Sequence, residues 1–124
     1  MAHILIIEDE KAMSDLVTIR FKVEGFETEQ AFTLAEAKQK LIAGSKYDVI
    51  LTDYLLPDGS LTDFLTSLRA DPTLKDLPVV IMTNYVEDLN NDQLKSLGVL
   101  DILIKYQVVP AQMVARIKQI LKIP

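Results

Sequence analysis

DVILTDYLLPDG, residues 48–59, is the stretch that decides the fold class of this chain. It begins with an apolar run, reaches an acid at Asp53, and then turns at Pro57 and Asp58-Gly59, residues that fix or free the backbone where a chain reverses. An apolar run of this length is typical of a strand buried on both faces, and such strands usually lie in parallel sheets covered by helices. Asp53 then lies at the carboxyl end of its strand, the edge at which open α/β sheets bind ligands. On this stretch alone, Asp53 is either a working carboxylate or a turn-forming aspartate.

Four other runs have the character of strands, and helical patterns separate them. Runs 4–7, 77–83 and 99–104 are mostly apolar, whereas 26–31 carries alternating polar residues and indicates an edge strand. Apolar residues at helical spacing predict the buried face of each intervening helix. In chain order these faces are Met13, Leu16, Val17 and Phe21; Leu34, Ala37 and Leu41; Leu61, Phe64, Leu65 and Leu68; Leu89, Leu94 and Leu97; and Met113, Ile117, Ile120 and Leu121.

Capping residues mark several helix ends. Thr33 and Glu36 have the spacing of a capping box, Gly25 is placed to end the first helix, and Pro110 suits the first position of the last helix. The segment 87–97 is the weakest helix, because it contains two adjacent asparagines and few apolar residues.

The strict alternation of strand and helix predicts a five-stranded parallel sheet with helices on both faces. Right-handed crossovers leave few topologies, and the polar second strand suits an edge position. Strand order 2-1-3-4-5 suits such an edge strand, and with it we expect a (βα)5 three-layer sandwich that resembles the flavodoxin-like fold.

Composition limits the possible functions. The 124 residues fit one domain and 49% of them are hydrophobic, so we expect a single domain, 1–124, without an output domain in this chain. The chain has no cysteine, which excludes disulfides and thiolate chemistry. A net charge of -5 argues against direct nucleic-acid binding, and no apolar run is long enough for a membrane span or a signal peptide, so we expect a cytoplasmic protein without a membrane partner.

Each of the strongest strands ends in a polar side chain, namely Glu8 and Asp9, Asp53, Thr83, and Lys105. Because parallel strands share one carboxyl edge, these groups should converge there. Crowded carboxylates repel by an amount on the order of kcal/mol even when screened, and a bound cation relieves the repulsion. All-oxygen ligation completed by water suits Mg²⁺, and Mg²⁺ with a lysine and a hydroxyl is what a phosphoryl group needs during transfer. Asp53 on the central strand is the expected nucleophile.

Each residue also has an ordinary structural interpretation. Glu8 and Asp9 suit a helix N-terminus, Thr83 could simply end a strand, and Lys105 could be a solvated turn residue. Their coincidence at successive strand ends favours the functional interpretation. His3 is the only histidine, which excludes a triad or a zinc site, so we expect it to be structural.

With these motifs the whole chain resembles a response-regulator receiver domain of two-component signalling. The resemblance rests on the pair Glu8-Asp9, on Asp53 in Asp-x-x-Leu-Pro-Asp-Gly, and on Thr83 and Lys105 at matching spacings. It implies that Asp53 is a phosphoacceptor that takes a phosphoryl group from the phosphohistidine of a sensor histidine kinase or His-phosphotransfer protein. Beyond self-phosphorylation and autodephosphorylation, no enzyme activity is implied.

The resemblance also assigns roles to the other residues. Asp9, Asp53 and the backbone carbonyl of Leu55 would bind Mg²⁺ directly, and Glu8 would bind it through water. Thr83 and Lys105 would hold the phosphoryl oxygens. The surface around the fourth helix, the fifth strand and the last helix would then change and bind a downstream target protein.

Three positions depart from the family pattern. Ile102 replaces the usual aromatic residue three positions before the lysine, Tyr106 replaces the proline that usually follows it, and Asn84 replaces a small residue after Thr83. A buried Ile102 cannot act as the switch, so we expect weak coupling to the fourth helix or a substitute ring from Tyr85 or Tyr106. We also expect the peptide before Tyr106 to be trans, since a non-proline cis bond costs about 2.5–4 kcal/mol.

These departures keep a second function open, an interaction module that works without phosphorylation. A Mg²⁺-dependent phosphohydrolase is disfavoured, because it would need an acid where Leu55 stands. A flavin-binding module is disfavoured too, because no phosphate-cradling loop follows the first strand.

Overall fold

A computed structural model describes residues 1–44, 46–87 and 89–124. Its main sheet has five parallel strands in the order β2-β1-β3-β6-β7, which confirms the expected order 2-1-3-4-5. The strands are β1 (His3–Ile7), β2 (Glu27–Ala31), β3 (Val49–Thr52), β6 (Val79–Thr83) and β7 (Val99–Ile104). The polar strand β2 lies at one edge, as its alternating sequence predicts.

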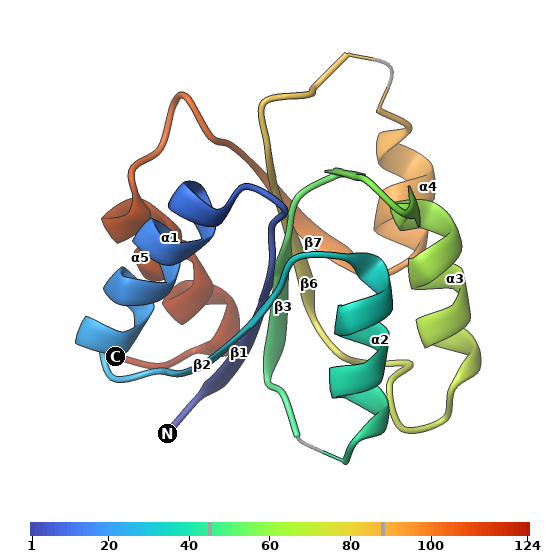
Figure 1. The fold of residues 1–124 in the computed structure, drawn as a ribbon, viewed down its shortest axis with the longest axis horizontal. Helices are drawn as coiled ribbons and strands as arrows, with labels where there is room; N and C mark the ends of the chain where they lie inside the picture. The colour runs from blue at the N-terminus through green and yellow to red at the C-terminus, as the bar shows by residue number, and fades with distance from the viewer. Residues whose placement is uncertain (45, 88) are drawn as a thin grey trace.

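Helices cover both faces of this sheet (Figure 1). The helices α1 and α5 lie on one face, and α2, α3 and α4 lie on the other. Their bounds are α1 (Lys11–Val23), α2 (Leu34–Ile42), α3 (Leu61–Ala70), α4 (Asn91–Ser96) and α5 (Pro110–Leu121).

The central strands supply two separate cores because their side chains alternate between the faces. Ile4 and Ile6 of β1 belong to the core beneath α1 and α5, whereas Leu5 and Ile7 belong to the core beneath the other three helices. Every residue of β3 and β6 is buried, as expected for parallel strands covered on both sides. The sheet is therefore a rigid platform for the groups that follow its strands.

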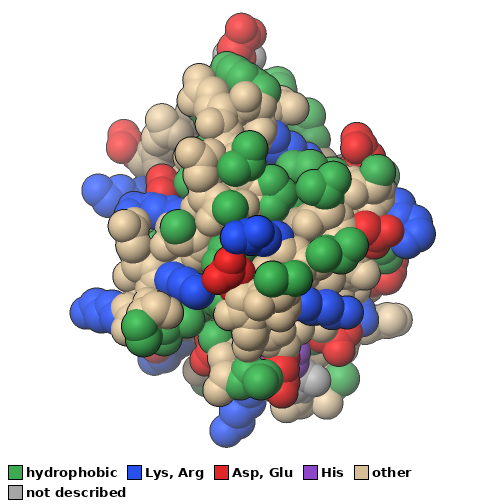
Figure 2. Space-filling model, turned by 90° about the vertical axis from the view of Figure 1, so that its left-hand side faces the viewer, with side chains coloured by type: hydrophobic (Ala, Val, Ile, Leu, Met, Phe, Trp, Pro, Cys, Tyr) green, Lys and Arg blue, Asp and Glu red, His purple; other side chains and the backbone are tan. Residues whose placement is uncertain are grey.

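The predicted buried face of α1 is partly wrong, since Leu16 is 56% exposed. The buried positions are Ser14, Val17, Thr18 and Phe21, a stripe offset from the apolar pattern. The small polar residue Ser14 faces the sheet, where its hydroxyl accepts a hydrogen bond from Gln30 of β2 at 2.9 Å. Leu16 instead lies with other exposed apolar residues on the α1/α5 side, where hydrophobic and charged side chains are interspersed (Figure 2).

The weakest predicted helix is shorter than expected. Within the described residues α4 begins at Asn91, and the Asn90 side chain caps it by accepting from the Gln93 N–H at 3.0 Å. Asparagine favours this cap because its side chain satisfies a free N–H group of the first turn. The predicted start at residue 87 is therefore wrong, and residue 88 lies outside the described part of the chain.

Two-residue strands that the sequence did not predict follow β3. Leu55–Leu56 (β4) and Gly59–Ser60 (β5) pair antiparallel around the turn at Pro57. In the turn of this hairpin, the Asp58 carboxylate accepts hydrogen bonds from the backbone N–H groups of Leu34 (2.8 Å) and Ala35 (3.0 Å). The turn after β3 is thus joined to the start of α2.

Thr33 caps α2 by accepting from the Glu36 N–H at 3.1 Å, which is the Thr33 half of the predicted capping box. His3 is structural as expected, because its ring bonds the Lys46 carbonyl and packs against Tyr47. Among the described residues no helix is long and apolar enough to cross a membrane.

Candidate functional site

The ends of β1, β3 and β7 bring the predicted polar residues to one edge of the sheet. The ladder fixes the backbone at each end: the Glu8 N–H donates to the Ala31 carbonyl at 3.0 Å, and the Asp53 N–H donates to the Ile7 carbonyl at 2.9 Å. The Lys105 N–H donates to the Thr83 carbonyl at 3.1 Å. Regular sheet pairing therefore fixes the backbone positions of Glu8, Asp53 and Lys105.

Lys105 joins two carboxylates. Its Nζ lies 2.7 Å from Asp53 Oδ2 and also donates to Glu8 Oε1. The Glu8, Asp53 and Lys105 side chains are 1%, 11% and 14% exposed, so these charges interact largely away from water. A charge-assisted bond in such surroundings is stronger than one at the surface.

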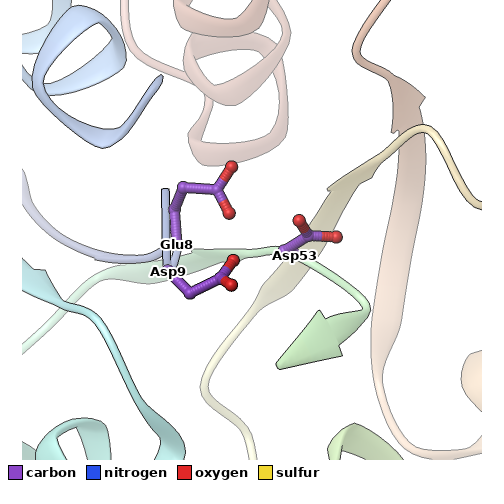
Figure 3. Close-up of side chains that lie close together, drawn as sticks. All are labelled: Glu8, Asp9 and Asp53. Atoms are coloured by element: carbon purple, nitrogen blue, oxygen red, sulfur yellow. The ribbon is translucent and has the colours of Figure 1, made fainter. Parts of the chain in front are cut away.

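The three predicted acids form one cluster, with carboxylate oxygens of Glu8, Asp9 and Asp53 within 4.8 Å of one another. Figure 3 shows them at the adjoining ends of β1 and β3. Glu8 Oε2 is buried without a hydrogen-bond partner among the described residues, although a buried carboxylate oxygen normally has one. The all-oxygen donor set and this unsatisfied atom fit a hard divalent cation such as Mg²⁺.

The electrostatics of the cluster follow from its charge count, two buried carboxylates beside one ammonium. Burial raises the pKa of Glu8 to about 7; Lys105 opposes the rise and the Asp53 charge adds to it. Burial lowers the pKa of Lys105, but its bonds to Asp53 and Glu8 outweigh burial and raise it overall. Burial therefore favours a proton on Glu8 in the metal-free protein, while the two neighbouring acids favour the charged form of Lys105.

The other oxygen of Asp53 is held by the backbone of the following loop. Asp53 Oδ1 accepts from the Tyr54 N–H at 2.6 Å and from the Leu55 N–H at 3.4 Å. These bonds orient the carboxylate so that Oδ2 meets Lys105.

Thr83 lies at the end of β6, as the sequence predicts, and is 1% exposed. Its hydroxyl is bonded within the turn that follows the strand. It accepts from the Tyr85 N–H at 3.0 Å. The structure therefore brings together the acids and Lys105, whereas the Thr83 hydroxyl is bonded to the turn after β6.

The departures from the family pattern have definite positions. Ile102 is partly buried and packs against the core beneath α2, α3 and α4, as expected. Tyr106 is 69% exposed, and in the described part of the chain every peptide bond is trans. Asn84 Oδ1 accepts from the Tyr106 N–H at 2.9 Å.

Sequence reasoning missed two contacts around the site. The Asn84–Tyr106 bond joins the loops after β6 and β7, and the rings of Tyr54 and Tyr85 stack with centroids 5.7 Å apart and planes at 5°. Both pairs join residues far apart in the chain, and no local pattern in one segment reveals its partner. The sequence signal for the Asn84–Tyr106 bond is that both residues depart from the family pattern, at positions directly after Thr83 and Lys105.

Comparison with known proteins agrees with this geometry. The family model described as "Response regulator receiver domain" matches residues 4–118, so the chain belongs to the response regulator receiver domain family. The expected function class, a phosphoacceptor receiver domain in two-component signalling, is confirmed at the level of the family.

Curated relatives include two full-length regulators. The phosphate regulon transcriptional regulatory protein PhoB of Pseudomonas aeruginosa is 29% identical over 119 residues, covering 96% of this chain and 51% of the relative. The DNA-binding dual master transcriptional regulator RpaA of Synechocystis is 32% identical over 122 residues, covering 98% and 50%. This chain therefore spans about half the length of these relatives.

Solved structures share the fold along nearly their entire length. A CheY-like response regulator receiver domain protein from Methanospirillum hungatei has a TM-score of 0.87 at 26% identity, covering 98% of this chain and 94% of that one. A two-component response regulator from Clostridium difficile has a TM-score of 0.86 at 28% identity, covering 98% and 97%.

Proposed function

We propose that Asp53 accepts a phosphoryl group from the phosphohistidine of a partner protein. The observation that carries this proposal is the contact of Lys105 with Asp53 Oδ2, 2.7 Å away, beside two further acids at the carboxyl edge of the sheet. A nucleophile, a cation that can follow the phosphoryl oxygens and a divalent-metal donor set are thereby assembled in one place.

Asp53 Oδ2 is the attacking atom, because Oδ1 is engaged by the loop backbone. A bond forms between this oxygen and phosphorus while the P–N bond of the phosphohistidine breaks. The electron pair of that bond stays on the imidazole nitrogen of the donor. Lys105 then transfers its contact from the carboxylate to a phosphoryl oxygen, which keeps the new negative charge paired.

Asp9, Asp53 and the Leu55 carbonyl would hold Mg²⁺, and Glu8 would hold it through water. When bound, the ion neutralises charge on the phosphoryl oxygens. Thr83 completes the site after its hydroxyl leaves the Tyr85 N–H and turns to the phosphoryl group. Autodephosphorylation by water returns Asp53 to the carboxylate.

The partners follow from this chemistry. The donor is a sensor histidine kinase or a His-phosphotransfer protein, as the response-regulator relatives imply. The acceptor of the signal is a downstream protein that binds the surface around α4, β7 and α5 after phosphorylation. We propose that this phosphoryl transfer takes place in the cytoplasm.

Fluorine NMR with beryllofluoride, a mimic of a phosphoryl group on a carboxylate, tests this function. We expect bound fluorine signals that require both Mg²⁺ and Asp53 and that vanish in Asp53→Ala. A protein that gives no bound signal at saturating Mg²⁺ and beryllofluoride would instead be an interaction module that works without phosphorylation.

A further inference from the structure

Two departures from the family pattern are bonded to each other. Asn84 Oδ1 accepts from the Tyr106 N–H at 2.9 Å, although the two residues are 22 positions apart. Proline has no N–H, so the residue usual at position 106 could not donate this bond. The bond to Asn84 therefore requires a residue other than proline at position 106.

The bond extends the pairing of β6 with β7 beyond the strands. The last backbone bond between these loops runs from the Lys105 N–H to the Thr83 carbonyl at 3.1 Å. The Asn84–Tyr106 bond follows it one residue further along both segments, with a side-chain oxygen as the acceptor in place of a backbone carbonyl. Both peptide N–H groups that flank the Lys105 α-carbon are thus bonded to the segment that carries Thr83.

A tight turn explains why this anchor matters. The Gln107 N–H donates to the Ile104 carbonyl at 2.9 Å, which places Lys105 and Tyr106 at the centre of the turn. Proline in the third position of a turn fixes φ and fits there behind a cis bond, whereas the bond before Tyr106 is trans. Tyr106 lacks that constraint, and its side chain is largely exposed, so the Asn84 bond supplies the restraint from outside the turn.

From this arrangement we infer that Asn84 is a positioning residue, which acts through the Tyr106 N–H to hold the Lys105 backbone where Nζ meets the phosphoryl group on Asp53. This inference rests on the proposed function of Asp53. It assigns to Asn84 and Tyr106 the task that the usual proline performs by its ring. Asn84 itself contacts neither the acids nor the phosphoryl group in this role.

The test distinguishes an effect on Lys105 from an effect on the metal site by measuring the beryllofluoride affinity and the Mg²⁺ affinity of one variant. In Asn84→Ala we expect beryllofluoride to bind about threefold to tenfold more weakly, the factor that corresponds to one net hydrogen bond. Mg²⁺ affinity, which depends on the carboxylates, should stay within about twofold of the parent value. Tyr106→Phe keeps the backbone N–H and is the matched control, so both of its affinities should equal those of the parent.

Amide hydrogen exchange of Tyr106 reports on the bond directly. Its protection should fall in Asn84→Ala and return in Asn84→Asp, which keeps a side-chain oxygen at the same place. Equal beryllofluoride affinity in parent and Asn84→Ala, or an equal loss of Mg²⁺ affinity, would overturn the inference, since the first shows no role and the second a general structural one. Absence of beryllofluoride binding by the parent protein would refute the proposed function, and with it any role of this pair in phosphoryl binding.

Discussion

Lys105 Nζ lies 2.7 Å from Asp53 Oδ2 and bonds Glu8 at the same time, so one ammonium serves two carboxylates that leave different strands. In the metal-free protein this cation performs part of the work expected of Mg²⁺, because it reduces the repulsion among the acids. After phosphorylation, Lys105 and Mg²⁺ would instead share the phosphoryl oxygens. The competition between these two arrangements can be measured.

Lys105→Met should change two affinities in opposite directions. Removing the ammonium should tighten Mg²⁺ binding about tenfold, or ~1.4 kcal/mol. This is a minor part of the interaction energy of two unit charges 4 Å apart, which is roughly 4 kcal/mol at an effective dielectric constant near 20. Beryllofluoride binding should weaken, because its fluorines lose their cationic partner. Calorimetric titration measures both, with Lys118→Met as a control, since Lys118 pairs with Glu24 instead. Weaker Mg²⁺ binding in Lys105→Met would contradict the predicted competition.

The stability of the metal-free protein should fall as the pH rises from about 5 to 8. Burial raises the pKa of Glu8 to about 7, so between its ordinary pKa and about pH 7 the folded state holds a proton that the unfolded state has already lost. Stability is therefore present at the lower pH and is lost as the pH passes through the folded pKa, by an amount on the order of 2 kcal/mol. Glu8→Gln cannot ionise and should flatten the profile measured by denaturant titration. A profile that is unchanged in Glu8→Gln would assign the dependence to another group.

The thermal stabilisation by Mg²⁺ should show the reverse dependence. Glu8 would contact Mg²⁺ through water, and its ionised form favours the ion, so we expect the Mg²⁺ affinity to rise with pH through about 7. Since ligand binding to the native state raises the melting temperature, the rise with Mg²⁺ should be small at about pH 5.5 and large at about pH 8. Asp9→Asn should remove most of this rise at either pH. An equal rise in the parent and Asp9→Asn would indicate nonspecific screening.

Asp58→Ala should destabilise α2 although Asp58 lies 24 residues further along the chain than Leu34. The variant leaves the Leu34 and Ala35 N–H groups without their carboxylate, and we expect the melting temperature to fall by roughly a few degrees. These two N–H groups lower the pKa of Asp58, so its contribution is present above the ordinary carboxyl pKa and disappears as the pH falls through the lowered value. Asp63→Asn in the first turn of α3 is the control. Equal melting temperatures at neutral pH would show that water replaces the cap without cost.

Tyr85 should couple the site to α4. Its ring stacks on Tyr54, and its N–H holds the Thr83 hydroxyl, so movement of Thr83 toward a phosphoryl group must disturb this turn. We expect beryllofluoride to change hydrogen exchange through Asn91–Ser96 in the parent and in Tyr85→Phe. In Tyr85→Ala the changes should stay in the loops around Asp53 and Thr83. Changes in α4 that persist in Tyr85→Ala would show that Tyr85 is not the substitute for the ring missing at Ile102.

The sequence predicted the parts of this molecule that depend on one segment at a time. Apolar runs that end in acids identify the strands, and parallel pairing then requires Glu8 and Asp53 to meet. The convergence of Lys105 with them follows from the same rule, since all three leave the sheet at one edge. The positions of these residues in the sequence are therefore sufficient to predict that they converge at one edge.

Features that depend on the fit between segments were not predictable. Leu16 has the expected spacing, but Ser14 occupies the close contact with β2, and the buried stripe shifts accordingly. Asp58 has the features of a local turn residue, yet it caps α2 because the loop after β3 lies against that helix. The Asn84–Tyr106 bond likewise requires that two loops be side by side.

Intact-protein mass measurement after incubation with Mg²⁺ and acetyl phosphate tests the central claim most directly. We predict one phosphoryl adduct on the parent protein, no adduct without Mg²⁺, and no adduct on Asp53→Asn. Peptide mapping should place the group on the segment that contains Asp53. A parent protein that stays unmodified at saturating donor and Mg²⁺, or an equal adduct on Asp53→Asn, would contradict the assignment of Asp53 as the phosphoacceptor.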